Sequence, residues 1–395
     1  MRLKHGIHLG YCTNIHRGET WDETFAALRT HTNAVRLRVA PDEPYGIGLR
    51  LGAAAAEELA AKREERDAFR RWLDKTNSYV FTINGFPYGA FHGTRVKEQV
   101  FAPDWSTEAR LVYTNRLFDL LDEIAPAGIE ASVSTLPGSF KEFIRPETSA
   151  AQLEAIRRNL RSCAHHIASI REKSGRDLHL GLEPEPLGLF ENSAETVDFF
   201  GSLLEGSSGD ERDLILRHVG VNYDTCHLAI EYEEPGAAIG AMRGAGIRIS
   251  KIHLSSALKL RPNPTALSRL RQFQEGVYFH QVLVAEGGVV VRRFKDLPDA
   301  LTWNETSPDE AGDEWRVHFH VPLHTSPEEG FGDTRDHLSG LLGAYAADPG
   351  WCRHFEFETY TWEVLPPALR ARDVVDQLTA EYGWCLAEFE KHGLR

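Results

Sequence analysis

The chain of 395 residues has few cysteines, only two methionines and no long apolar run. Its five cysteines are scattered without a C-x-x-C pair, so the sequence predicts neither a disulfide framework nor a thiolate metal site. No segment approaches the roughly 18 consecutive apolar residues of a membrane-spanning helix. The first ten residues, MRLKHGIHLG, lack the apolar core of a secretion signal. We therefore expect a cytoplasmic protein with free thiols and no membrane span.

Basic residues are also in the minority, with 44 Lys and Arg against 58 Asp and Glu and a formal net charge of −14. Charge-driven binding to nucleic acid or to an anionic membrane needs clustered Lys and Arg, so neither partner is expected. The patterns G-x-G-x-x-G and G-x-x-x-x-G-K-[ST] are absent, which disfavours nucleotide-binding α/β folds. Histidine, in contrast, is abundant, with 18 residues, more than a packed core explains.

Short apolar strands alternate with longer helical patterns along the chain, which is typical of βα units around a mostly parallel sheet. Eight strands, each followed by a helix-length segment, predict a (β/α)₈ barrel, an α/β fold in one domain over residues 1–395. An open doubly wound sheet is the alternative. The predicted strands are Gly6–Cys12, Ala34–Val39, Tyr79–Asn84, Ile129–Ser134, Leu178–Glu183, His218–Tyr223, Ile247–Leu254 and Arg353–Glu358.

The last two predicted strands are separated by a segment too long for one βα unit. Within it, Val277–Val284 and Val289–Phe294 resemble the two arms of a hairpin, and Trp315–Pro322 resembles a further strand. We interpret residues 260–325 as an insertion with a β-hairpin over the barrel mouth. The alternative is that Trp315–Pro322 is itself a barrel strand.

Polar residues end several of these apolar strands. In a β/α barrel the C-terminal strand ends converge at one mouth, where two Glu, an Asp and a His would need a cation to join them. Mixed carboxylate and imidazole ligands suit Mn²⁺, Zn²⁺, Mg²⁺ or Co²⁺. One acidic residue at a strand end is usually a helix cap or half of an ion pair, but four on separate strands favour a metal site. The four residues are Glu183, Asp224, His253 and Glu358.

Two further signals involve histidine. His227 follows Asp224 by three residues where the chain leaves a strand, so both can face one centre; the alternative is that His227 packs beneath a helix. In the segment WRVHFHVP, His318 and His320 share one face at the period of a strand. We favour His320 as a ligand, since it lies just before Pro322. A solvated edge face is the alternative.

The N-terminal half contains weaker candidates for substrate contact. The segment FTINGFPYGAFHG follows a strand and is dense in Gly, aromatic and polar residues, which suits binding of a small polar ligand; a packed turn is the alternative. Alternate residues of the first two strands face the lumen of a barrel. The resulting substrate-binding candidates are His8, Asn14, Arg38, Asn84, Tyr88 and His92, to which Glu185 is added from the segment after Glu183.

The strand-end residues and five longer segments resemble known proteins. The order of a strand-end Glu, an Asp-x-x-His, a His-x-Ser and a Glu-Thr pair is similar to that of the xylose-isomerase-like TIM-barrel superfamily, which includes sugar epimerases, xylose isomerases and endonuclease IV. More narrowly, most of the chain resembles the EboE family of metabolite-traffic proteins. The segments that carry this narrower resemblance are HLGYCTNIHRGETW, FTINGFPYGAFHG, VKEQVFAPDW, SVSTLPGSFK and WRVHFHVPLH.

The superfamily resemblance implies a TIM barrel that holds one to three divalent ions. It implies ligand roles for the four strand-end residues, with His227 and His320 as the additional ligands of multi-metal members. Glu358 is preferred to Glu356 because Glu358-Thr359 matches the Glu-Thr pair of the superfamily. The narrower resemblance implies a role in a secondary-metabolite pathway of the ebo type and contact with other proteins of that gene cluster.

The sequence departs from endonuclease IV in its N-terminal half. Where that family has two histidines at early strand ends, this chain has Asn84 and Ser134 or Thr135. A phosphodiesterase with three metals is therefore disfavoured.

Three functions follow as hypotheses. The first is a metal-dependent isomerase or epimerase of a small oxygen-rich metabolite, in which the metal stabilises an enediolate, Glu183 and Glu358 move the proton, and other groups orient the substrate. The second is a multi-metal phosphoester hydrolase. The third is a carrier that holds a metabolite without turnover. The orienting groups of the first hypothesis are His227, Lys251 and Glu185.

Overall fold

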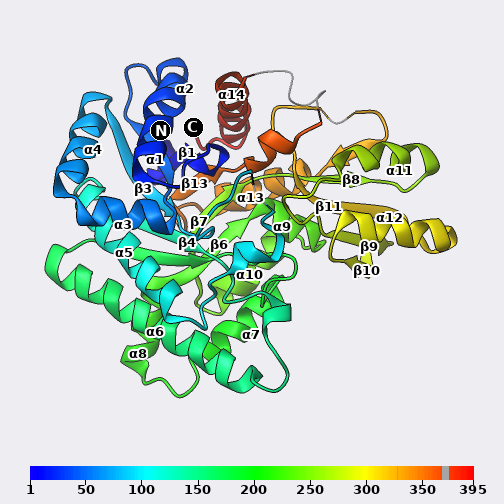
Figure 1. The fold of residues 1–395 in the computed structure, drawn as a ribbon, viewed down its shortest axis with the longest axis horizontal. Coiled ribbons are helices and arrows are strands. Elements are labelled where there is room, and N and C mark those ends of the chain that lie inside the picture. Colours follow the sequence, from blue (N-terminus) through cyan, green and yellow to red (C-terminus); the bar gives the residue numbers. More distant parts are fainter. Residues whose placement is uncertain (94, 327, 367–372) are drawn as a thin grey trace.

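The computed structural model describes residues 1–93, 95–326, 328–366 and 373–395. Eight strands form one sheet in the order β1-β13-β7-β6-β5-β4-β3-β2, and neighbouring strands in this order pair in parallel (Figure 1). A single parallel bridge between Cys12 and Gly48 brings the two ends of the sheet together, so the barrel is nearly closed. The strands are β1 (His8–Tyr11), β2 (Tyr45–Arg50), β3 (Ser78–Asn84), β4 (Ala131–Thr135), β5 (Leu178–Leu182), β6 (Val219–Asp224), β7 (Arg248–Leu254) and β13 (His354–Phe357).

Helices surround this barrel, as Figure 1 shows. Side-chain caps begin two of these helices: Thr20 and Glu23 form a reciprocal capping box, and the Asn192 side chain accepts a hydrogen bond from the Glu195 backbone N–H at 2.9 Å. The helices packed around the barrel are α1 (Trp21–Ala27), α2 (Asn33–Val39), α3 (Ala53–Ala61), α4 (Arg63–Lys75), α5 (Glu108–Ile124), α6 (Ser149–Ser174), α7 (Ser193–Leu203), α8 (Gly209–His218), α9 (Thr225–Ile230), α10 (Pro235–Gly244), α13 (Arg335–Ala347) and α14 (Val374–Lys391).

One predicted barrel strand is wrong. Residues 34–39 belong to helix α2, which continues α1 through a short π-helix, Leu28–Thr32. The alternation of Val and Arg suggested a strand, but the helix buries Val35 and leaves Leu37 54% exposed. The second barrel strand is β2, which sequence reasoning missed because two glycines interrupt its apolar pattern. Gly48 must lack a side chain, since a Cβ there would lie 1.6 Å from the Glu356 Oε1 atom.

A second sheet occupies the chain between β7 and β13. Its five strands pair antiparallel in the order β10-β9-β11-β8-β12, and it projects beside the barrel together with two helices (Figure 1). The hairpin and the strand predicted at Trp315–Pro322 are present, but the sheet begins before residue 260 and ends after residue 325. Its elements are β8 (Ala257–Leu260), α11 (Pro264–Leu270), β9 (Val282–Glu286), β10 (Val289–Phe294), α12 (Leu297–Thr306), β11 (Glu314–His320) and β12 (Phe331–Asp333).

The apolar core lies between the barrel strands and the helices, whereas the barrel lumen is polar. Thr82 and His354 both hydrogen-bond to the Ser132 hydroxyl at 2.8 Å, and the Lys251 ammonium donates to the Ser134 hydroxyl at 3.1 Å. The bonds from β13 and β7 to β4 cross the lumen, because these strands are not neighbours in the sheet. Hydrogen bonds therefore hold the middle of the barrel together where many barrels use apolar layers.

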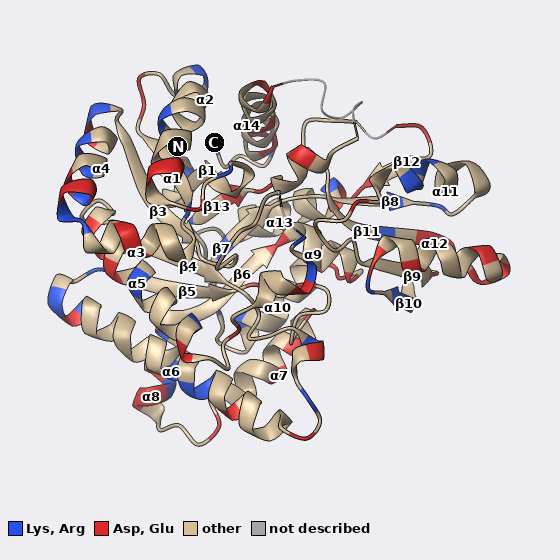
Figure 2. Ribbon diagram, viewed as in Figure 1, with Lys and Arg blue, Asp and Glu red and all other residues tan. Residues whose placement is uncertain are grey.

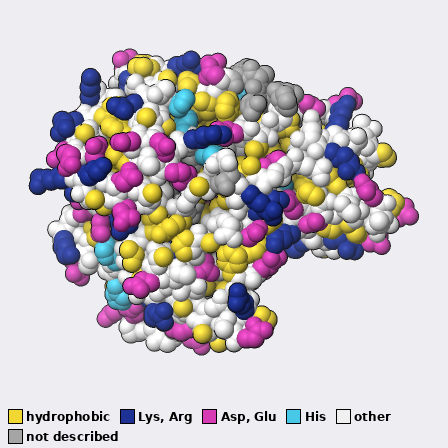
Figure 3. Space-filling view, in the orientation of Figure 1, with side chains coloured by type: hydrophobic (Ala, Val, Ile, Leu, Met, Phe, Trp, Pro, Cys, Tyr) yellow, Lys and Arg dark blue, Asp and Glu magenta, His cyan; other side chains and the backbone are white. Residues whose placement is uncertain are grey.

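Charged residues lie mainly on the helices and loops that surround the barrel strands (Figure 2). On the face shown in Figure 3, Lys and Arg are interspersed with Asp and Glu, without a large patch of one sign. All five cysteines are buried and free. Among the helices that the structure describes, none combines the length and the apolar character needed to cross a bilayer.

The C-terminal helix α14 carries a buried acid, Glu381, whose Oε1 atom accepts hydrogen bonds from the Leu323 backbone N–H and the Thr359 hydroxyl. Burial raises its pKa from 4.5 to about 7. The folded protein therefore binds this proton more tightly than the unfolded chain does, and stability falls by roughly 3 kcal/mol as the pH rises from about 4.5 to about 7. We expect Glu381→Gln to remove this fall, so that the variant is more stable than the wild type at pH 8 by about 1–3 kcal/mol and similar to it near pH 4.5.

Urea unfolding at several pH values measures this effect. Glu388, on the same helix, is the matched control. Burial favours a higher pKa for Glu388, but hydrogen bonds from Ser339 and Lys391 outweigh burial and lower this pKa. Glu388→Gln should therefore reduce stability above pH 4.5. A Glu381→Gln variant whose stability follows the wild-type pH dependence would contradict the assignment.

Candidate metal centre

The four strand-end residues predicted from the sequence meet at the C-terminal mouth of the barrel. The His253 Nδ1 atom on β7 lies 3.3 Å from the Glu183 Oε1 atom beyond β5, and 3.6 Å from the Asp224 Oδ2 atom at the end of β6. It lies 3.3 Å from the Glu358 Oε2 atom beyond β13. One ligand atom from each residue lies within 4.8 Å of the others, and each of the four residues is at most 5% exposed.

His253 is held by a second carboxylate behind it. Its Nε2 atom lies 3.1 Å from the Glu356 Oε2 atom, and the Glu356 carboxylate forms a fully buried ion pair with Lys251. A carboxylate behind a histidine fixes which ring nitrogen faces a metal, here Nδ1. We call Glu183, Asp224, His253 and Glu358 together the ring of four. Glu358 belongs to it, as the Glu-Thr pair implied, whereas Glu356 supports it by holding His253 from behind.

The ring is strongly acidic. Burial opposes ionisation of Glu358, but the nearby His253 outweighs it and lowers the Glu358 pKa to about 2. Burial also opposes protonation of His253, but Glu358 and Glu183 raise its pKa well above 6.5. In the absence of a metal, a proton on His253 thus supplies part of the positive charge that the carboxylates require. A divalent cation would supply more.

A second cluster adjoins this ring and consists of His227, His318 and His320. Each places its Nδ1 atom against a carbonyl oxygen, namely Pro184 O at 3.1 Å, Gln281 Oε1 at 2.7 Å and Glu358 O at 3.0 Å, respectively. A carbonyl oxygen only accepts, so Nδ1 carries the proton in each ring and Nε2 presents a lone pair.

These three Nε2 atoms are buried and have no hydrogen-bond partner. The same is true of Asp224 Oδ2, which lies 4.0 Å from His227 Nε2, and of Glu185 Oε1. Buried polar atoms are rarely left without partners. Three sets of ligand atoms from this cluster and its neighbours lie close enough to share an ion, namely Asp224–His227–His320, Glu185–His227–His318 and Cys226–His318–His320. The donor set therefore fits one or more divalent metals beyond the ring of four.

Protonation in the second cluster is set mainly by burial. Burial, with Glu183 and Asp224 nearby, raises the Glu185 pKa well above its ordinary value. Burial, followed by the neighbouring His227 and His320, lowers the His318 pKa well below 6.5. In the absence of a metal, Glu185 therefore holds a proton and His318 is a neutral ligand.

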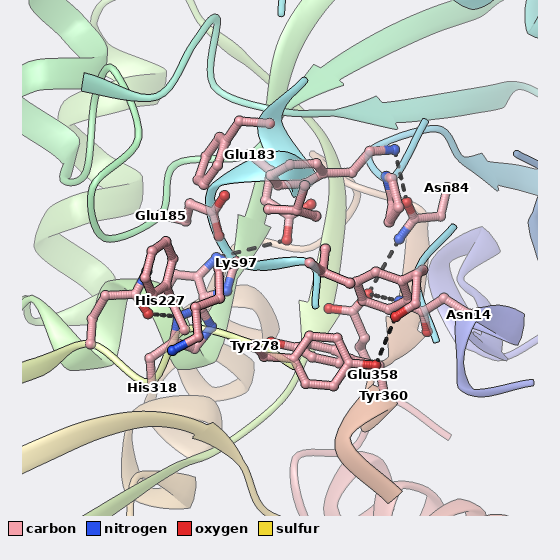
Figure 4. A pocket seen from close by; sticks show the side chains of 18 residues that line it. Asn14, Asn84, Lys97, Glu183, Glu185, His227, Tyr278, His318, Glu358 and Tyr360 are labelled. Carbon is pink, nitrogen blue, oxygen red and sulfur yellow. Dashed lines mark hydrogen bonds and ion pairs between the residues drawn. The ribbon is translucent and has the colours of Figure 1, made fainter. Parts of the chain in front are cut away.

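A pocket opens above the two clusters (Figure 4), and two of the predicted substrate contacts reach its floor. The amide groups of Asn14 and Asn84 donate to the Glu358 Oε1 atom at 2.7 and 3.2 Å. Glu185 also lines the pocket, beside His227. The hydrogen bonds from Asn14 and Asn84 fix the orientation of the Glu358 carboxylate.

Other predicted residues lie away from the pocket. His8 starts β1 at the opposite end of the barrel, where it hydrogen-bonds to Tyr79 at 2.8 Å. Arg38 lies on α2 and forms an exposed ion pair with Asp376, because the predicted strand is a helix. Lys251 is enclosed in the lumen. The remaining two support the pocket wall from behind: Tyr88 packs on Tyr113, and His92 bonds to the Asn14 carbonyl and the Tyr278 hydroxyl.

Sequence reasoning missed several residues of the site. The Asn222 amide donates to the Glu183 Oε2 atom at 2.8 Å and lies 3.3 Å from His253 Nδ1. Asn222 precedes Asp224 by two residues on β6, so strand alternation was a signal that could have found it. The rings of Tyr278, Phe279 and Tyr360 had no such signal, because they lie in segments outside the barrel strands.

Comparison with known proteins extends to structure and not to sequence. No family model matches the chain, and no curated protein matches its sequence. A xylose-isomerase-like TIM-barrel protein from Mycobacterium smegmatis, solved in complex with magnesium, is 14% identical and has a TM-score of 0.51; the match covers 98% of this chain and 99% of that one. D-psicose 3-epimerase from Clostridium cellulolyticum H10, solved with D-tagatose, is 11% identical and has a TM-score of 0.51; the match covers 97% of this chain and 98% of that one. An L-ribulose 3-epimerase is 12% identical and has a TM-score of 0.50; the match covers 99% of this chain and 96% of that one.

This chain has the xylose-isomerase-like TIM-barrel fold. The predicted fold class is thereby confirmed. In TIM barrels the active site lies at the C-terminal ends of the strands, which is where the ring of four and the second cluster lie. The narrower resemblance to the EboE family rests on the sequence segments alone and stays a prediction.

Proposed function

We propose that this protein is a divalent-metal enzyme that isomerises or epimerises a small molecule bearing a carbonyl group next to a hydroxyl group. The observation that carries the proposal is the ring of three carboxylates around His253 Nδ1, which lies within 3.3–3.6 Å of all three. Two proteins that share the fold are ketose 3-epimerases, and a third was solved with magnesium. Their chemistry agrees with the donor set of this chain.

The ion would be Mn²⁺, Zn²⁺, Mg²⁺ or Co²⁺, because carboxylates and one imidazole make up the ring. Such an ion acts as a Lewis acid toward a substrate carbonyl. The residues that would hold it are Glu183, Asp224, His253 and Glu358.

Two carboxylates are placed to move a proton. Glu183 and Glu358 approach His253 Nδ1 from β5 and β13, which are separated in the sheet by β6 and β7. Each is oriented by amide donors, Asn222 on Glu183 and Asn14 with Asn84 on Glu358. One carboxylate can remove a proton from the carbon that bears the hydroxyl group and the other can return it on the opposite face. His227 and Glu185, at the edge of the pocket, would orient the substrate oxygens.

Hydrogen exchange tests this role. After the metal content is measured, the protein loaded with each of the four ions is incubated in D₂O with dihydroxyacetone, D-fructose and 2-hydroxyacetophenone, and deuterium at the hydroxyl-bearing carbon is followed by NMR. We expect exchange with the wild type and a loss of about a hundredfold or more in Glu183→Gln and Glu358→Gln. Glu191→Gln is the matched control, since Glu191 is buried but pairs with Lys141 and Arg293 outside the pocket.

Unchanged exchange in both Glu variants would refute the proton-transfer role. Absence of any bound divalent ion in the wild type would refute the metal centre. Ligand retention with no exchange under any of the four ions would instead identify a carrier.

The second cluster favours a second candidate function, a phosphoester hydrolase. Asp224, His227 and His320 could hold another ion next to the first, and paired ions suit phosphoester hydrolysis. This candidate predicts more than one ion per chain and hydrolysis of bis(4-nitrophenyl) phosphate. A count of one ion by elemental analysis would reject it.

We also propose that the substrate belongs to secondary metabolism of the ebo type and that other proteins of that cluster contact this one. Support comes from where the EboE-like segments lie. Four of the five contribute residues to the pocket, among them Asn14, Asn84, Phe101 and His318. The segments that carry the resemblance therefore coincide with the proposed substrate site.

A further inference from the structure

The pocket above the metal centre has two chemically different parts. Its floor consists of carboxylates, imidazoles and amides, whereas nine of its eighteen lining residues are aromatic, Val or Pro residues that form the walls (Figure 4). The pocket contains about 590 Å³ of space not occupied by atoms, part of it open to solvent.

Apart from Tyr360, which follows β13, the walls come from two segments outside the barrel strands. One includes the 3₁₀ helix Lys97–Phe101 after β3, and the other includes Phe279 before β9. The backbone N–H groups of Val96 and Lys97 both donate to the Val277 carbonyl, at 2.8 and 3.0 Å, which joins the two segments. The walls are therefore a fixed part of the fold.

In this apolar part of the pocket, which we call the chamber, aromatic rings form two groups of contacts. In the first group, the ring of Tyr278 lies 5.3 Å from that of Phe91 and 5.1 Å from that of Tyr360, measured between centroids. In the second group, Phe86 lies 5.7 Å from Phe101. Rings packed at these distances present edges and faces that suit another flat apolar group.

Two polar groups of the walls, the Tyr278 hydroxyl and the Lys97 ammonium, are already engaged. The Tyr278 hydroxyl donates to the Phe91 carbonyl at 3.0 Å and also lies 3.1 Å from His92 Nδ1. Lys97 is the only cation among the eighteen lining residues, and it forms an ion pair with Asp296. The walls consequently offer apolar surface. The Tyr278 hydroxyl and the Lys97 ammonium add neither a free charge nor a spare hydrogen-bond donor.

From this segregation we infer that the substrate carries a flat apolar group, about the size of a benzene ring, next to the paired oxygens that the metal centre binds. This inference rests on the proposed function and names its substrate class. A sugar with hydroxyl groups along its whole length would bury several of them against the walls without partners, at a cost for each. A phosphorylated tail would find no free cation there.

Two hydroxamates test the inference, because both bind a metal ion through the same pair of adjacent oxygens. Acetohydroxamate carries a methyl group and benzohydroxamate a phenyl group. Affinities for the Zn²⁺-loaded protein are measured by calorimetry and corrected for the affinities of both compounds for free Zn²⁺ in the same buffer. We expect benzohydroxamate to bind about tenfold more tightly or better, because the phenyl group buries more apolar surface.

Phe279→Ala and Phe143→Ala form a matched pair of variants. Both residues are half-buried and both contact Phe140, at centroid distances of 6.3 and 5.2 Å, but only Phe279 lines the pocket. We expect Phe279→Ala to weaken benzohydroxamate binding about fivefold without changing acetohydroxamate binding, and Phe143→Ala to change neither.

Equal corrected affinities of the two hydroxamates for the wild type would overturn the inference and leave the metal centre intact. An equal effect of both Phe variants would also overturn it. If the protein takes up none of the four ions and binds neither compound, the proposed function fails as well, so the two failures are distinguishable.

Discussion

Asp224→Asn is expected to lower the affinity of the protein for Zn²⁺ or Mn²⁺ by about a hundredfold or more, which exceeds the usual effect of losing a residue that only supports a ligand. Asp224 belongs to the ring of four and also to the ligand set Asp224–His227–His320. Its Oδ2 atom is buried without a partner, 3.6 Å from His253 Nδ1. An amide NH₂ in that position would point a donor at the ion.

The fold should survive this substitution. The Asp224 Oδ1 atom caps helix α9 by accepting from the Cys226 backbone N–H at 2.7 Å, and the Asn carbonyl oxygen can do the same. Calorimetric titration of metal into the chelator-treated protein measures the affinity, and circular dichroism checks the fold. Asp104→Asn is the control, because Asp104 is buried and bonds to Ser139 away from the pocket. Wild-type affinity in Asp224→Asn would rule Asp224 out as a ligand.

Lys251→Met should reduce the free energy of unfolding by about 3–5 kcal/mol, because the buried Glu356 carboxylate loses its ion pair with Lys251 and keeps the contact with His253 alone. Both partners of the lost ion pair are fully buried. The double variant Lys251→Met/Glu356→Gln also removes the Glu356 charge and should recover part of the loss. Guanidinium unfolding at pH 7 measures each variant.

Lys259→Met provides the contrast for this prediction. Lys259 pairs with Asp336 at 2.7 Å, but the Asp336 side chain is 69% exposed. Exposed pairs contribute about 0–1 kcal/mol, so this substitution should have little effect. If Lys251→Met were no more destabilising than Lys259→Met, the pair in the lumen would have no structural role.

The meeting of the four candidate metal ligands was predictable because these residues follow a topological rule. Glu183, Asp224, His253 and Glu358 each end or nearly end an apolar strand, and parallel strands bring such ends together whatever the sequence between them. The error at residues 34–39 has a different cause. A run that alternates Val and Arg satisfies the pattern of a strand, while the true strand β2 contains two glycines, one of which, Gly48, makes room for Glu356.

The chamber above the centre was not predictable in the same way. Phe101 and Phe279 lie in segments without regular periodicity, and their shared position depends on backbone bonds to Val277 between segments far apart in the chain. Asn222 and Glu356 were missed or set aside for a different reason. Their roles are to orient Glu183 and His253, and a sequence pattern does not show which side chain orients another.

The segment between β7 and β13 bears on how such a protein diversifies. Phe279, Gln281 and His318 all belong to this one continuous stretch, and they supply part of the chamber wall and part of the second cluster. Recombination at the two ends of the stretch would exchange these features together and leave the ring of four on its strands. Natural variants with different ligand preferences could therefore arise by replacement of this one stretch of chain. Chimaeras joined near residues 256 and 334 are the natural units for engineering new selectivity.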